Sequence, residues 1–229
     1  RVLFRSTTVQ GLTWLPKDPT LQNFEFLFFG HANGLVVTLD RTVVMPMISS
    51  LVTSTLGTAI AVICGTLSSY AVVRFGQAPS MPLSILQLRL FPPLAVMIPV
   101  MVMWAFMGAI DTWWGLSIIY GIVTLPFGFW LMKTFFEEVP IEIEEAARVA
   151  GSSRFRVFWK ITLPIVKPGL ATCVLFVFIM NWSDYLLALL LTQKEWVTLP
   201  VYMSTLSAAM SGQMYGMKAA LGILAAVDR

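Results

Sequence analysis

Long apolar stretches alternate with short polar segments along this chain. Four of these stretches cover residues 43–73, 81–107, 115–133 and 165–191, and a fifth covers residues 215–227. A helix needs about 20 residues to cross the hydrocarbon core of a bilayer, so the first four are long enough and the fifth is too short. The pattern predicts an all-α protein, a polytopic membrane helix bundle, and we expect the sequence to be a fragment of a longer chain.

The first stretch carries small residues at four-residue spacing. Gly57, Ala61, Gly65 and Ser69 fall on one face of a helix. Helices in lipid associate through close packing of small residues, because the hydrophobic effect does not drive them together there. We therefore expect this face to be buried against other helices.

Prolines interrupt the second stretch, residues 81–107. Pro92, Pro93 and Pro99 lie inside it, and Arg89 lies near its start. A proline leaves a backbone carbonyl without its helical donor, and lipid cannot supply another. We expect a broken helix that faces protein or a wet cavity, with Arg89 reaching to the membrane interface.

The composition agrees with a membrane location and excludes several kinds of site. The chain is 57% hydrophobic and only 12% charged, whereas a soluble domain is about a quarter charged. The cysteines, Cys64 and Cys173, lie within apolar stretches and are expected to be packing residues. The single histidine, His31, cannot build a metal site, so neither a metal nor a cofactor is expected. The chain has no glycine-rich phosphate loop for hydrolysing ATP, and no basic surface of the kind that binds nucleic acid.

Charged residues are concentrated in one segment, residues 133–167. Its five acidic and six basic residues are Glu137, Glu138, Glu142, Glu144, Glu145, Lys133, Arg148, Arg154, Arg156, Lys160 and Lys167. The short segments predicted on the other side of the membrane, 108–114 and 192–214, contain a single cation between them. Because cations favour the cytoplasmic side, the charged segment is predicted to be cytoplasmic and residues 1–42 to be an extracytoplasmic segment. Residues 192–214, which include Pro200, are expected to be a loop.

Local signals predict a short helix in the middle of the charged segment. Pro140 suits the first turn of a helix, and acidic residues follow it where the helix dipole favours them. Glu144 and Arg148 stand in the favourable i,i+4 order for an ion pair. Gly151 fits the position just after a helix end.

A second short helix is predicted to follow, with Ser152 or Ser153 as its cap. Together the two helices offer an apolar surface made of methyl groups and aromatic rings. Its members are Ile143, Ala146, Ala147, Ala150, Phe155, Phe158 and Trp159. This surface favours docking of a soluble partner. A loop lying on lipid headgroups is one alternative, which the glutamates disfavour because such helices prefer Lys and Arg. Acid–base catalysis is another, although acids in an opening turn mostly cap the helix.

The spacing within this segment resembles the EAA loop of ABC-importer permeases. The residues of this loop are Glu145, Ala146, Ala147, Gly151, Phe155, Ile161, Leu163 and Pro164. Other stretches resemble the carbohydrate-uptake branch of the family, similar to the second permease of maltose-type importers. They include SSYAVVRFG from Ser68, LRLFPPLAVMIPV from Leu88 and NWSDY from Asn181. The family usually has Asp before the glycine of the loop, where this chain has Ala150.

The resemblance implies a MetI-like permease fold, with residues 43–229 as the transmembrane domain and a cytoplasmic coupling loop at residues 137–164. It implies a non-catalytic, multi-pass subunit of the bacterial or archaeal cytoplasmic membrane that forms half of the pathway of an ATP-driven sugar importer. The expected partners are a cytoplasmic ATPase dimer that docks on the EAA loop, a second and different permease subunit, and an extracytoplasmic sugar-binding protein. A first helix before residue 1 and the rest of the last helix after residue 229 are expected to be missing.

Polar residues near the end of the fourth stretch are candidates for the substrate path or a gate. Asn181, Trp182, Asp184 and Tyr185 offer hydrogen-bonding groups and aromatic rings of the kind that sugar sites use. An ionisable residue within a membrane segment is also a functional candidate, although helix packing is an alternative role for all four. For the whole protein, the alternatives are an ABC permease for amino acids, peptides or phosphonates, and a passive gated channel.

Overall fold

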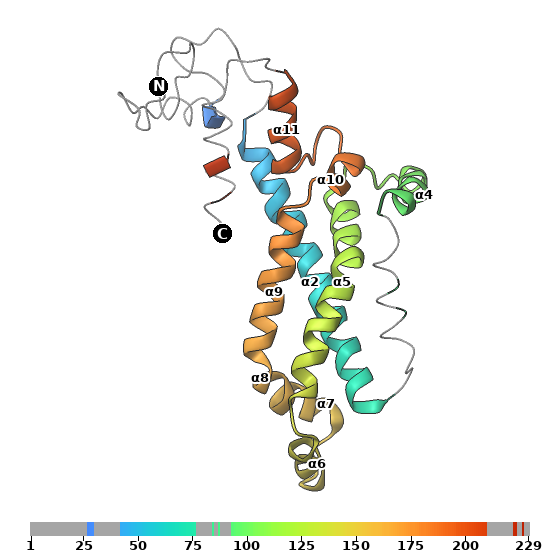
Figure 1. Cartoon of the computed structure of the whole chain (residues 1–229), viewed down its shortest axis with the longest axis vertical. Helices are drawn as coiled ribbons and strands as arrows, with labels where there is room; N and C mark the ends of the chain where they lie inside the picture. Colours follow the sequence, from blue (N-terminus) through green and yellow to red (C-terminus); the bar gives the residue numbers. More distant parts are fainter. Residues whose placement is uncertain are drawn as a thin grey trace, which may run out of the picture. The chain divides into compact units, whose positions relative to one another are not determined.

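The computed structural model describes residues 27–29, 42–76, 84, 87, 93–209, 222–223 and 226. The regular elements of this described part are helices (Figure 1). In chain order they are α2 (Val44–Phe75), α4 (Pro93–Phe106), α5 (Trp113–Glu137), α6 (Ile141–Val149), α7 (Arg154–Val157), the π-helical segment η1 (Phe158–Thr162), α8 (Leu163–Ile165), α9 (Lys167–Trp182), α10 (Leu186–Leu191) and α11 (Leu199–Ala209). The predictions for Arg89, Pro92 and nearly all of residues 1–42 and 215–227 lie outside the described residues.

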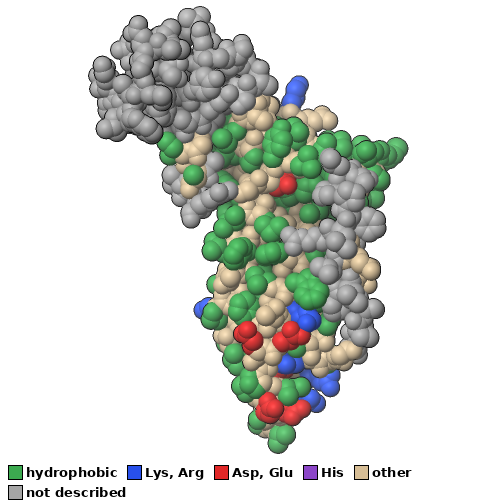
Figure 2. Space-filling model, in the orientation of Figure 1, with side chains coloured by type: hydrophobic (Ala, Val, Ile, Leu, Met, Phe, Trp, Pro, Cys, Tyr) green, Lys and Arg blue, Asp and Glu red, His purple; other side chains and the backbone are tan. Residues whose placement is uncertain are grey.

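The chain divides into two compact units. One comprises Arg1–Leu51 with Asp184–Arg229, and the other comprises Val52–Ser183. In the second unit, α2, α5 and α9 run side by side, and α6 and α7 lie beyond one end of these helices (Figure 1). That end is where most of the charged side chains on the face in Figure 2 gather, while hydrophobic side chains cover much of the helical surface.

Two of the predicted spans are confirmed as continuous helices. Both α2 and α5 are long and apolar enough to cross a membrane. Helix α2 matches the predicted stretch 43–73, and α5 covers the predicted stretch 115–133 and continues to Glu137. The helices Arg154–Ile165 and Lys167–Trp182 qualify as a third span only when taken together, and they are bent by 75° at the break between them.

The fourth predicted span, 165–191, is wrong as a single helix. The structure ends α9 at Trp182 and begins α10 at Leu186. Asp184 provides the physical reason, because its Oδ2 accepts hydrogen bonds from the backbone N–H groups of Leu187 (3.1 Å) and Ala188 (3.3 Å). These bonds satisfy backbone donors at the start of a helix, so a new helix begins at this point.

The loop predicted for residues 192–214 is also partly wrong, because α11 occupies Leu199–Ala209. Pro200 is the second residue of this helix, where the missing N–H has no helical partner to lose. The N–H of Leu199 donates to Ser50 Oγ at 2.7 Å within the same compact unit. A proline was therefore a helix-start signal here and not a loop signal.

In the described part of the second stretch, the predicted break at Pro99 is not observed. Helix α4 continues from Pro93 to Phe106 through Pro99. The end of α4 is attached to α5, since the indole N–H of Trp104 donates to the Gly115 carbonyl at 3.1 Å. This helix alone is shorter than a membrane span.

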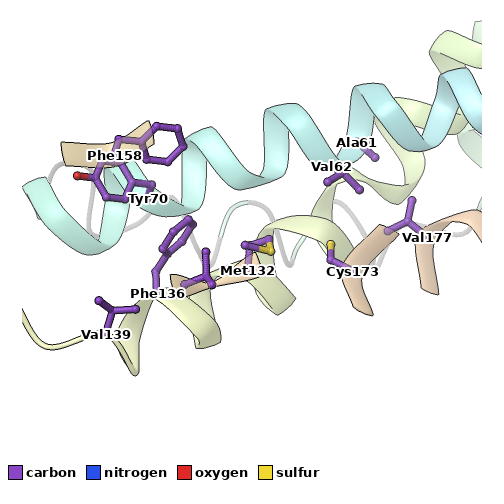
Figure 3. Packing of buried hydrophobic residues seen from close by; sticks show 10 residues of the cluster. Ala61, Val62, Tyr70, Met132, Phe136, Val139, Phe158, Cys173 and Val177 are labelled. Carbon is purple, nitrogen blue, oxygen red and sulfur yellow. The ribbon is translucent and has the colours of Figure 1, made fainter. Parts of the chain in front are cut away.

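The small-residue face of α2 is buried, as predicted. A Cβ on Gly65 would lie 2.8 Å from the backbone nitrogen of Phe129 and 2.9 Å from the carbonyl carbon of Gly128. The backbones of α2 and α5 therefore approach each other directly, as small residues permit in lipid. Ala61, Met132, Cys173 and other buried side chains, most of them from α2, α5 and α9, form one apolar cluster along these helices (Figure 3).

Candidate functional site

The first helix of the charged segment, α6, has the bounds and the termination that the sequence predicts. It starts after Pro140 and ends at Val149. Gly151 has φ of +88°, and the N–H groups of Gly151 and Ser152 donate to the carbonyls of Arg148 and Ala147, both at 3.0 Å. This is a Schellman motif, which requires a left-handed residue and therefore favours glycine.

The second helix begins at Arg154 with Ser153 as its cap, so the second of the two predicted caps is used. The Ser153 hydroxyl accepts from the N–H of Arg156 at 3.4 Å. The helix then widens into the π-helical segment η1 and continues through α8 to Ile165. Within the EAA loop, Leu163 packs against the apolar cluster, whereas Pro164 is exposed and Ile161 is half-buried.

Glu144 is the buried residue of α6, and its partner is Arg74 of α2. Its exposed fraction is only 6%, and Arg74 Nε donates to Glu144 Oε1 at 2.7 Å. The predicted pairing of Glu144 with Arg148 is therefore wrong. An exposed i,i+4 pair stabilises a helix by only a few tenths of a kcal/mol, whereas a buried carboxylate requires a charge partner and hydrogen bonds around it.

Three further hydrogen bonds complete the arrangement around this ion pair. The Tyr70 hydroxyl donates to Glu144 Oε2 at 2.9 Å, and the Thr162 hydroxyl donates to Oε1 at 2.9 Å. Arg74 Nη2 donates to the Val139 carbonyl at 2.8 Å. We call Tyr70, Arg74, Glu144 and Thr162 the buried polar network.

An aromatic shell covers one side of this network. The ring of Tyr70 lies 4.7 Å from that of Phe158 and 5.4 Å from that of Phe136, measured between ring centroids. Figure 3 shows these rings together at the end of the apolar cluster, with Val139 beside them. A small cleft opens on another side, and its lining includes Arg148, Arg154 and Glu145.

The buried polar network was not predicted, although the sequence contains a local signal for it. Tyr70 and Arg74 are four residues apart, so they lie on one face at the charged end of α2. Both belong to SSYAVVRFG, one of the stretches that resemble the carbohydrate-uptake branch. No local pattern could connect them with Glu144, because the contact spans 70 residues of sequence.

Helices α6 and α7 and the segment η1 expose large apolar side chains. Val149 is 90% exposed and Phe155 is 75% exposed. We call this set the exposed apolar residues: Ile141, Ile143, Val149, Phe155 and Trp159. Phe158, which was predicted to belong to the docking surface, is buried instead. Of the EAA loop, Glu145, Ala146 and Gly151 are exposed as well, and Ala147 is half-buried. Apolar side chains concentrated on a charged protrusion indicate a surface for a protein partner.

The candidates for the substrate path do not share one environment. Asn181 is 2% exposed and its Nδ2 donates to Thr58 Oγ1 of α2 at 3.1 Å. Trp182 is buried and stacks on Phe178. Asp184 caps α10, and Tyr185 is exposed. Asn181 thus connects two helices of one unit and Trp182 packs within α9 of that unit, whereas Asp184 and Tyr185 belong to the other unit.

Metal ligands do not gather within the described residues, where no group of three His, Cys, Asp or Glu side chains is placed to hold an ion. The buried network instead uses its carboxylate to bind a guanidinium and two hydroxyl groups of the chain itself. Its chemistry is that of a structural joint and not that of a reaction centre.

Comparison with known proteins gives consistent matches. The profile of the family described as binding-protein-dependent transport system inner membrane component matches residues 57–227. The trehalose transport system permease protein SugB of Mycobacterium tuberculosis is 32% identical over 200 residues, covering 86% of this chain and 69% of SugB. The maltodextrin transport system permease protein MdxG of Bacillus subtilis is 36% identical over 160 residues, covering 69% of this chain and 58% of MdxG.

Solved structures show the same fold. A chain of a bacterial ABC transporter involved in the import of the acidic polysaccharide alginate superposes with a TM-score of 0.74 at 22% identity, covering 96% of this chain and 79% of that chain. A chain of the MetNI methionine ABC transporter superposes with a TM-score of 0.63 at 16% identity, covering 81% of this chain and 86% of that chain. At these identities the likeness concerns the fold alone, and it confirms the all-α fold of the MetI-like type.

Proposed function

Because this chain belongs to the family of binding-protein-dependent transport system inner membrane components, we propose that it is the permease subunit of an ATP-driven sugar importer. The resemblance to ABC-importer permeases is confirmed by this membership. The two relatives above are named for the transport of trehalose and maltodextrin, which supports a carbohydrate as the substrate. This chain spans 69% and 58% of their lengths, and the substrate and the partners are parts of the proposal.

The exposed apolar residues of α6, α7 and η1 are the observation that carries the proposal. These elements lie at the end of the second unit where charged side chains gather (Figures 1 and 2). The excess of cations in this segment favours the cytoplasm, so the exposed apolar residues are presented to soluble proteins there. A cytoplasmic ATPase dimer is the partner that an importer of this family requires, and the EAA loop is the docking site for one of its subunits.

The proposed mechanism is mechanical and involves no covalent chemistry on this chain. Closure of the ATPase dimer on ATP displaces α6 and α7 as one body. Helix α6 is bonded to α2 through Glu144 and Arg74, and α7 continues through η1 and α8 to the bend before α9. Through these two connections the displacement reaches α2 and α9 and switches the pathway between its inward-open and outward-open states.

The other expected components complete this scheme. A second, different permease forms the other half of the pathway, and an extracytoplasmic sugar-binding protein delivers the substrate on the side of the membrane opposite the charged segment. The membrane is the cytoplasmic membrane of a bacterium or archaeon. For the substrate path we retain Asp184 and Tyr185, which are partly exposed, whereas the burial of Asn181 and Trp182 supports a packing role.

Gly151 allows a direct test of docking. Apart from its two chain neighbours, no residue in the described part of the chain lies within 4 Å of a Cβ placed on it, so a large side chain there has open space in which to meet a partner. Gly151→Ala is the control, because it introduces the same left-handed backbone strain, about 1–2 kcal/mol, without bulk. We expect Gly151→Trp to insert into the membrane but to lose ATP-driven uptake, and Gly151→Ala to retain most of it. Uptake at the wild-type rate in Gly151→Trp would contradict the docking site.

The substrate class requires a separate measurement. The transporter, reconstituted in liposomes with its binding protein, should hydrolyse ATP faster when a disaccharide or oligosaccharide is supplied. Amino acids and peptides serve as controls and should leave the ATPase rate at its basal value. Stimulation by an amino acid or a peptide in place of a sugar would refute the carbohydrate assignment.

A further inference from the structure

The attachment of α6 to the rest of the permease depends on one side chain. Of the residues of α6, all of which are described, Glu144 alone is buried. The neighbouring Glu145 is exposed. The two adjacent glutamates therefore face different surroundings, and only the second belongs to the three-residue motif that gives the loop its name.

We propose that Glu144 and Arg74 are positioning residues for transport: they lock α6 onto the cytoplasmic end of α2, so that displacement of α6 becomes displacement of that span. This inference rests on the proposed function of the chain as an importer permease. It assigns force transmission to a pair of residues outside the EAA motif. Glu145, which is exposed, is left for contact with the ATPase.

Convergence of separate segments at one carboxylate supports the proposal. Tyr70 and Arg74 come from α2, and Thr162 comes from the end of η1, the segment that leads to α9. Arg74 also holds the carbonyl of Val139, in the connection between α5 and α6. A single push on α6 is thereby shared among the three membrane helices of this unit.

The charges make this joint stiff. The side chains of Arg74 and Glu144 are each only 8% exposed, so little water reaches either charge and each depends on the other as its partner. Opening a buried pair leaves an uncompensated charge at a high free-energy cost. Purely apolar contacts, by contrast, are non-directional, and they would allow α6 to slide against α2.

Another ion pair of the described part provides a matched control. Lys133 and Glu137 are paired on α5, also near the charged end, but Glu137 is 52% exposed and the pair stays within one helix. Exposed pairs of this kind contribute little to stability. They also connect no two helices, so neutralising them should leave force transmission intact.

The first experiment measures the ratio of sugar transported to ATP hydrolysed in the reconstituted complex. Glu144→Gln and Arg74→Lys are compared with wild type and with the double variant Lys133→Gln, Glu137→Gln. Arg74→Lys keeps the positive charge but loses the planar fork that binds both Glu144 and Val139. We expect both network variants to retain ATP hydrolysis while the transport ratio falls by about tenfold, within the range typical of coupling between sites. The control should keep the wild-type ratio.

A ratio of sugar transported to ATP hydrolysed equal to that of wild type in both network variants would overturn the proposal, even if uptake and hydrolysis both fell in proportion. If the Glu144→Gln complex does not assemble, Arg74→Lys alone tests the proposal, because the lysine keeps a positive charge beside Glu144. If the wild-type complex itself imported no sugar, the proposed function would fail. The second experiment would then still test whether Glu144 and Arg74 hold α6 on α2.

The second experiment measures the joint itself and requires no sugar. Cys64 is exposed on α2 and Cys173 is buried, so spin labels on Cys64 and on Val149→Cys report the distance between α2 and α6. With partner subunits free of exposed cysteines, we expect one narrow distance distribution that persists with and without ATP. Glu144→Gln or Arg74→Lys should broaden it. An equally narrow distribution in these variants would show that the network does not hold α6 in place.

Discussion

The side-chain amide of Asn181 on α9 donates a hydrogen bond to the hydroxyl of Thr58 on α2, across 123 residues of sequence and at 3.1 Å. Both residues are buried, and a Cβ on the nearby Gly57 would lie only 3.4 Å from the Asn181 nitrogen. The amide thus lies inside a tight contact between helices. This geometry favours helix packing over contact with a transported sugar.

Replacing Asn181 with Ala should therefore reduce stability and leave sugar recognition intact. Hydrogen bonds between membrane helices contribute about 0.6 kcal/mol on average, so the decrease in the free energy of unfolding should be of that order. Thr58→Ala and the double variant complete a cycle that isolates the hydrogen bond. Unfolding in detergent and the sugar concentration at half-maximal uptake are the measurements. A higher half-maximal concentration with unchanged stability would place Asn181 in the substrate path.

Gly65 should tolerate no larger residue, because its contact is with the backbone of α5. Gly65→Ala places a methyl group within 3 Å of Phe129 N and Gly128 C, and overpacking of this kind costs about 1–3 kcal/mol. Ala59→Leu is the control, since Ala59 is exposed on the same helix. Thermal unfolding of the purified subunit should show a lower transition temperature for Gly65→Ala alone. Equal transitions for the two variants would contradict the close approach of α2 and α5.

The adjacent glutamates of α6 should have separable effects. Glu144→Gln leaves Arg74 as a buried charge without its anionic partner, and breaking such a pair costs about 3 kcal/mol or more. Glu145→Gln alters an exposed side chain, so we expect a change within about 0.5 kcal/mol but weaker co-purification of the ATPase. Thermal unfolding and co-purification are measured on the same preparations. The assignment is wrong if Glu145→Gln is the destabilising change.

Asp184 should act mainly through its side-chain oxygen as a helix cap. Asp184→Ala removes the acceptor for the N–H groups of Leu187 and Ala188, which costs about 1 kcal/mol. Asp184→Asn retains an equally good cap but removes the charge. We expect Asn to preserve both stability and sugar-stimulated ATP hydrolysis. Loss of the sugar response in Asp184→Asn, at normal stability, would instead give the carboxylate charge a role in the substrate path.

Local sequence signals were sufficient where the structure depends on near neighbours. The apolar stretches at 43–73 and 115–133 became α2 and α5, because a helix closes its own backbone hydrogen bonds within the segment. Pro140 and Gly151 bound α6 as predicted, since proline and glycine restrict or release the backbone torsions of their own residues. The spacing of the EAA loop was enough to identify the family.

Only the tertiary structure decided which partners the polar side chains take. For Glu144, the sequence offers Arg148 four residues away and Arg74 seventy residues away, and the helical spacing favours the first. Burial reverses this preference, because a carboxylate removed from water needs a partner inside the same low-dielectric site. The interruption of the helix at Asp184 has a comparable origin, because side-chain hydrogen bonds to the backbone compete there with a continuous helix. The sequence by itself thus determined the helices and the family, and the packing of α2, α5, α6 and η1 determined the joint between them.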